Sequence, residues 1–69
     1  MNNNTKLYTG DIFLNTVDKT TYVVTRLLGN RMLEVADVTN TSLKKLLETD
    51  AISRGLVSGA IRRVTFTEP

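Results

Sequence analysis

The side chains that could carry chemistry are mostly basic, and they gather in the second half of the chain. Residues 40–69 hold five basic and three acidic residues, a net charge of +2, whereas residues 1–39 hold four of each and sum to zero. The basic residues of the second half are Lys44, Lys45, Arg54, Arg62 and Arg63. Because the two N–H groups of an arginine guanidinium match the spacing of phosphate oxygens, a cluster of these side chains would hold an anion. That cluster would consist of Lys44, Lys45, Arg54 and Arg63. The alternative is that they are ordinary solvated side chains that keep the domain in solution.

Groups suited to catalysis are scarce. The chain contains no histidine and no cysteine, so the usual general base, thiol nucleophile and zinc ligands are missing. Glu34 and Asp37 lie three residues apart, and on a strand they would point to opposite faces rather than form a carboxylate pair. We therefore expect a protein that is not an enzyme and needs no cofactor. A magnesium site assembled from distant carboxylates is a minor alternative.

Length and composition are typical of one small domain. The chain has 69 residues, of which 41% are hydrophobic, which is too apolar for a disordered tail. A chain this short buries only about 60% of its unfolded surface, and small domains often gain stability by association. A homo-oligomer is therefore an open alternative. The polar residues 1–6 are expected to be flexible.

No apolar run approaches the roughly 20 residues that a membrane span needs. The first six residues are not followed by the apolar run of a signal peptide either. A cytoplasmic location is the simplest expectation.

A β-hairpin over residues 21–38 is the clearest structural pattern. Residues 21–27 are rich in β-branched side chains, which favour strands. Residues 31–38 form the partner, and Gly29-Asn30 between them suits a type II′ turn. Simple alternation would place Leu28 opposite to Leu27, on the side of Tyr22 and Val24.

Two further strands are expected at the ends of the chain. Residues 12–14 follow a break at Gly10 and read as a short first strand, and residues 60–67 read as the last one. If Val64 and Phe66 face the core, Arg63 faces solvent and Arg62 lies near the rim.

The region after the hairpin has a helical pattern. Ser42 and the polar residues before it can cap a helix, and Leu43, Leu46 and Leu47 follow at helical spacing. This predicts a short helix over 42–48, with Lys44 and Lys45 on its polar side. Thr49 or Asp50 would cap a second helical turn that ends at Gly55, and residues 55–59 would form a loop or a close backbone approach.

These elements predict an α+β, mainly β fold. We expect a small antiparallel sheet or an SH3-like barrel of about three to five strands, with one or two short helices at about 42–55. The segments Gly10-Asp11-Ile12-Phe13 and Tyr22-Val23-Val24 resemble the first strands of SH3-like barrels. The resemblance covers about the first 38 residues and rests on apolar spacing.

Some apolar residues are difficult to place inside one small core. Leu28, next to Leu27, and Leu56, next to Val57, are the main examples. Apolar side chains left outside a core favour a protein interface. The alternative is that a very small domain uses all of them in its core.

Three functions follow. In size and style the chain is similar to small accessory proteins of phages and mobile elements, which implies binding that inhibits or modulates a host protein, through the hairpin or residues 52–57. A second hypothesis is an oligomer that traps an anionic small molecule such as a nucleotide, using Arg63 and Lys44. A third is nonspecific nucleic-acid binding through the basic second half.

Overall fold

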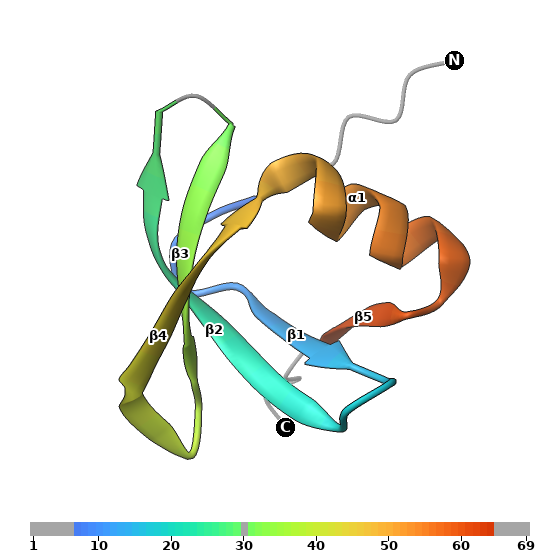
Figure 1. Cartoon of the computed structure of the whole chain (residues 1–69), viewed down its shortest axis with the longest axis horizontal. Coiled ribbons are helices and arrows are strands. Elements are labelled where there is room, and N and C mark those ends of the chain that lie inside the picture. Colours follow the sequence, from blue (N-terminus) through green and yellow to red (C-terminus); the bar gives the residue numbers. More distant parts are fainter. Residues whose placement is uncertain (1–6, 30, 65–69) are drawn as a thin grey trace, which may run out of the picture.

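A computed structural model describes residues 7–29 and 31–64 and shows a mainly β fold with one helix (Figure 1). The elements in chain order are β1 (Ile12–Asn15), β2 (Thr20–Leu28), β3 (Met32–Asp37), β4 (Asn40–Glu48), α1 (Thr49–Ser58) and β5 (Ile61–Val64). The strands form one antiparallel sheet in the order β4-β3-β2-β1-β5, with β4 and β5 at its edges. Helix α1 connects these two edge strands. The predicted α+β, mainly β class is therefore confirmed.

The predicted hairpin is confirmed as β2 paired with β3, but its turn differs from the prediction. Leu28 pairs with Met32, so residues 29–31 form the loop. Gly29 does not have the positive φ that a type II′ turn requires, whereas Arg31 has a φ of 60°. The type II′ turn is therefore wrong for Gly29, and Asn30 lies outside the described residues. A longer loop that ends in a left-handed residue replaces it.

A β-bulge at Thr25 changes which side chains of β2 share a face. The register shifts between Val24, opposite Val35, and Arg26, opposite Glu34, so Thr25 is the extra residue. Its hydroxyl donates to Oε1 of Glu34 at 2.8 Å and lies 3.1 Å from the carbonyl oxygen of the same residue.

The bulge corrects the predicted position of Leu28. Leu27 pairs with Leu33 and joins the face of Val24, whereas Leu28 pairs with Met32 on the opposite face. Simple alternation along β2 failed because it takes no account of an inserted residue.

The predicted helix over 42–48 is wrong, because this segment is strand β4. Leu47 pairs with Leu33 and Lys45 pairs with Val35 along the far side of β3. The leucine spacing also fits a strand, and the backbone of β3 pairs with residues 44–48 of β4 in continuous register, beyond an irregularity at residues 41–43. A helix of two turns has no comparable partner and is unstable alone.

Helix α1 starts slightly earlier and ends later than the second predicted helical turn. Glu48 is its N-cap residue and makes no capping hydrogen bond through its side chain, so the expected cap by Thr49 or Asp50 is wrong. The helix continues through Gly55 and ends at Gly59, whose φ is 90° and whose N–H donates to the carbonyl of Gly55. A loop over residues 55–59 is therefore wrong as well.

Of the two alternatives predicted for residues 55–59, the close backbone approach is confirmed, and it lies at Gly55. A Cβ at Gly55 would lie 2.5 Å from Cδ1 and 2.6 Å from Cγ1 of Ile61, at the start of β5. Glycine therefore lets α1 lie directly against the strand that follows it.

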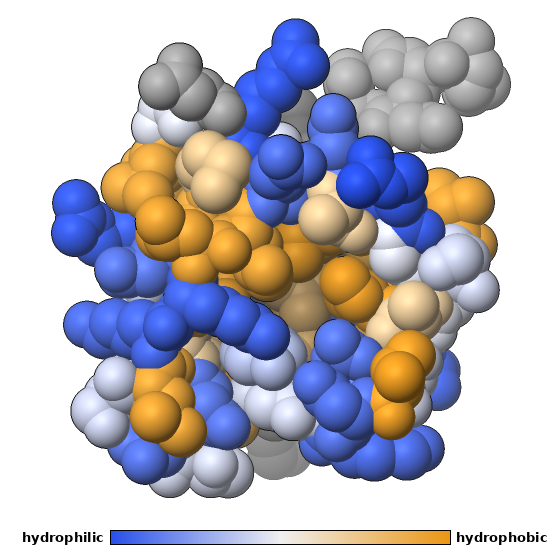
Figure 2. Space-filling view, in the orientation of Figure 1, coloured by the Kyte–Doolittle hydropathy of each residue, from blue (hydrophilic) through white to orange (hydrophobic). Residues whose placement is uncertain are grey.

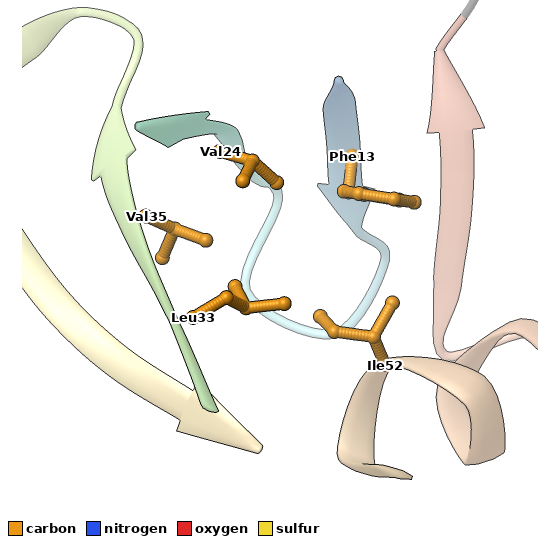
Figure 3. Close-up of a cluster of buried hydrophobic side chains, with 5 residues drawn as sticks. All are labelled: Phe13, Val24, Leu33, Val35 and Ile52. Carbon is orange, nitrogen blue, oxygen red and sulfur yellow. The ribbon is translucent and has the colours of Figure 1, made fainter. Parts of the chain in front are cut away.

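The core lies between α1 and one face of the sheet, which we call the inner face. Phe13, Val24, Leu33 and Val35 of the sheet and Ile52 of α1 are each no more than 2% exposed and converge in Figure 3. Leu7, Tyr22, Leu47, Leu56 and Ile61 pack partly buried around them. We call the opposite side of the sheet the outer face.

The face assignment of the last strand also differs from the prediction. Arg63 pairs with Phe13, so Arg63 rather than Val64 belongs to the inner face. Val64 pairs with Ile12 on the outer face, and Phe66 lies outside the described residues. The prediction failed because it assumed that the most apolar residues of a strand must face the core.

Gly55→Ala tests the contact between α1 and β5. Alanine improves helix propensity by about 1 kcal/mol. We expect the clash with Ile61, which costs about 1–3 kcal/mol, to outweigh it and lower the free energy of unfolding in urea.

The matched control is Ile61→Val, which removes the nearest methyl group. The double variant should lose less stability than the sum of the two single variants. A more stable Gly55→Ala protein would show that α1 and β5 do not approach this closely.

Candidate functional site

Helix α1 covers only part of the inner face and leaves an apolar hollow beside it. Its volume is about 100 Å³. Figure 2 shows apolar surface in the middle of this face, with hydrophilic side chains around it. The inner-face hollow is lined by Phe13, Asn15, Tyr22, Val35, Lys45, Leu47, Ala51, Ile52 and Ile61.

Two aromatic rings and two cations lie together at this face. Phe13 and Tyr22 are directly opposite each other in the β1–β2 register. Lys45 Nζ lies 4.5 Å from the centre of the Tyr22 ring, and the guanidinium carbon of Arg63 lies 5.1 Å from the centre of the Phe13 ring. Such cation–π contacts contribute about 0.5–1 kcal/mol at exposed sites. Each cation therefore covers part of an aromatic ring of the inner face.

Arg63 is held in place by the turn that precedes β1. Asp11 Oδ2 accepts hydrogen bonds from the Tyr8 backbone N–H at 2.8 Å and from Arg63 Nη1 at 3.1 Å. Gly10, with a φ of 97°, donates its N–H to the carbonyl of Val24 at 2.8 Å and fixes this turn on β2. An ion pair this exposed adds little stability, so its main effect is to position Arg63.

A second hollow adjoins the first along β4. It has a volume of about 180 Å³ and shares Tyr22 and Lys45 with the inner-face hollow. Its other lining residues are Thr20, Asp37, Leu43 and Lys44. Leu43 is 58% exposed and offers apolar surface at this end. The Tyr22–Lys45 contact therefore lies between the two hollows.

The structure divides the predicted basic residues between the two faces of the sheet and the helix. Lys44 and Lys45 are adjacent on β4 and point to opposite faces, with Lys45 on the inner one. Arg62 pairs with Leu14 on the outer face, and Arg54 lies exposed on α1. Lys45 and Arg63 are the predicted basic residues that share the inner face.

The predicted apolar binding residues lie apart from each other. Leu28 is half-buried on the outer face near the hairpin loop, and Leu56 is half-buried against the core. Larger exposures belong to other apolar side chains, which are Tyr8, Val17, Leu27, Val38, Leu43, Leu46 and Val57.

The sequence did not indicate Tyr22 as a site residue. Its contact with Lys45 depends on β4 being a strand and on the register of β4 with β3. Asn15 and Ala51 carried no signal at all. The pairing of strands, rather than any motif, brings these residues together.

The described part of the chain offers neither a membrane-spanning helix nor an acidic metal site. None of its helices has the length and apolar character needed to cross a membrane. Residues 7–29 and 31–64 contain no group of three or more acidic side chains placed to hold a metal ion.

Comparison of the chain with protein-family models, curated protein sequences and solved structures found no match.

Asp37 lines the adjoining hollow and carries a perturbed carboxyl. The Thr39 hydroxyl donates to Asp37 Oδ1 at 2.6 Å, and the Thr39 backbone N–H donates to the same oxygen at 2.8 Å. These bonds favour the charged carboxylate and lower the pKa of Asp37 below its usual 3.8.

We expect Asp37 to titrate below 3.8 and Thr39→Val to raise its pKa, because valine removes the hydroxyl donor. A carboxyl whose pKa is lowered by folding stabilises the fold at pH values above its pKa in the unfolded chain. This stabilisation is lost as the pH falls through its pKa in the folded chain. NMR titration of the Asp37 carboxyl carbon measures the shift. An unchanged pKa in Thr39→Val would contradict the assigned cause.

Proposed function

We propose that this chain is a non-catalytic domain that binds a segment of another protein in the inner-face hollow. The observation that carries the proposal is an apolar hollow of about 100 Å³ beside the exposed cation of Lys45. Sites for whole small molecules usually measure about 300–1,000 Å³. The hollow instead suits one apolar side chain, the kind of anchor that contributes most at protein interfaces.

The charge around the hollow favours an acidic neighbour for that anchor. Lys45 lies at its border, and its side chain is exposed above Tyr22. An aspartate or glutamate next to the apolar residue of the partner would pair with Lys45 while the anchor enters the hollow. We therefore propose a partner segment in which an apolar side chain is followed or preceded by an acidic one.

The other two functions receive less support. Anion capture by a joint cluster is less favoured because Lys44 and Lys45 point to opposite faces and Arg63 is already bound to Asp11. Stacking on nucleic-acid bases usually needs several exposed aromatic rings, whereas cations lie over Phe13 and Tyr22 and leave Tyr8 as the exposed ring of the described residues.

We further propose that the partner is a host protein that the chain inhibits or modulates. This proposal rests on the similarity of the chain in size and style to phage accessory proteins. An SH3-like barrel is likewise a proposal. It is supported by four consecutive antiparallel strands whose first member also pairs with the last strand, β5.

Ala51→Leu tests the proposed binding site by filling the hollow from α1. The probe is a library of random peptides selected on the wild-type chain. Selected peptides should share an apolar residue beside an acidic one. Their affinity for Ala51→Leu should fall by about tenfold or more, because the anchor loses its burial.

The matched control is Val57→Leu, which enlarges an 81% exposed side chain of the same helix. It should leave the affinity unchanged, and thermal unfolding should show that both variants are folded. Equal binding to wild type and Ala51→Leu, or no selected peptide at all, would contradict the proposal.

A further inference from the structure

Strand β4 forms a long, exposed edge of the described sheet. It has nine residues, and all of them except the half-buried Leu47 are exposed. Leu46 is 57% exposed on it. Unpaired backbone groups and apolar side chains on one edge are a template for a further strand. We propose that β4 pairs antiparallel with β4 of a second copy of this chain, forming a symmetric dimer.

The backbone of β4 presents suitable donors and acceptors. The N–H of Thr49 donates to the carbonyl of Arg31 at 2.9 Å, in line with the register that pairs Leu47 with Leu33. Residues of an antiparallel strand alternate between bonding to one neighbour and to the other. Lys45 and Leu47 therefore bond to β3. The N–H and C=O groups of Lys44, Leu46 and Glu48 point toward the free edge.

These three residues form a self-complementary pattern. With a two-fold axis at Leu46, this leucine lies opposite Leu46 of the second copy. Lys44 then lies opposite Glu48 of the second copy, and Glu48 opposite its Lys44. Each pair exchanges both backbone hydrogen bonds, and the opposite charges directly across from each other are favourable. All three side chains lie on the outer face, so the leucines also contact each other there.

The other symmetric registers lack this match. If the two-fold axis moves toward the N-terminus, Lys45 or Lys44 lies opposite the same lysine of the second copy. Like charges directly opposite each other are destabilising. A shift the other way places Glu48 opposite Leu46 and moves Lys44 opposite Asp50, which belongs to α1.

The charge pattern of β4 is why a second copy is favoured over an unrelated strand. An unrelated strand would not require Lys44 and Glu48 to lie at equal distances on either side of Leu46, whereas a symmetric dimer does. The chain is also small, with 69 residues, so association adds stability that a single copy has little core to supply. The inference goes beyond the proposed binding function and does not depend on it.

The test is sedimentation of the purified full chain over a dilution series. The wild type should form dimers of twice 7.7 kDa that dissociate on dilution. Leu46→Lys places two ammonium groups at the axis and should raise the dissociation constant by about tenfold or more. The control Val57→Lys adds the same charge to an exposed position on α1 and should leave dimerisation unchanged.

Charge reversal tests the register itself. Lys44→Glu and Glu48→Lys should each weaken the dimer, because each creates two pairs of like charges. The double variant restores opposite pairs and should return the dissociation constant to within a few-fold of the wild type.

A monomeric wild type at millimolar concentration would overturn the proposal. A dimer that is indifferent to Leu46→Lys would place the interface elsewhere and also overturn it. Failure of the double variant to recover would overturn the register.

Discussion

The structure depends on the burial of Ile52 of α1 against the inner face of the sheet. Ile52 is the buried residue of this ten-residue helix, and a helix of that length is not stable alone. Removing such a side chain beyond Cβ costs about 2–5 kcal/mol, which is comparable to the whole stability of a small domain. The same contact fixes the path of the chain from β4 to β5, two strands at opposite edges of the sheet. Gly55 allows that path by leaving space for Ile61.

The inner-face hollow exists because α1 is too small to cover the whole inner face of the sheet. A short helix with Ala51 and Gly55 on its buried side cannot fill the face of a five-stranded sheet. Cations cover the rings of Phe13 and Tyr22 instead of a second apolar layer. A lysine that rests on a ring near the surface is displaced or recruited by a partner at low cost, whereas a packed apolar layer is not. The site is thus a part of the core that the helix leaves open.

The sequence predicted correctly those elements whose residue pattern was compatible with only one type of secondary structure. The β-branched run before Gly29 had no good helical alternative, so the hairpin was correct. The leucines at 43, 46 and 47 satisfied both a helix and a strand, and the free side of β3 decided between them. The bulge at Thr25 left no periodic trace. Lys45 and Arg63 were identified as candidates by their charge. Their grouping with Tyr22 and Phe13 required the register of strands that are distant in sequence.

The most direct test of the open inner face is methyl NMR of the free chain under xenon pressure. Xenon enters dry apolar cavities and shifts the methyl signals that line them. The largest shifts should fall on Val35, Leu47, Ala51, Ile52 and Ile61, which line the hollow, whereas Val23 and Val64 on the outer face should remain unchanged. An absence of shifts, or equal shifts on both faces, would show that side chains close the hollow in solution and would contradict the proposed binding site.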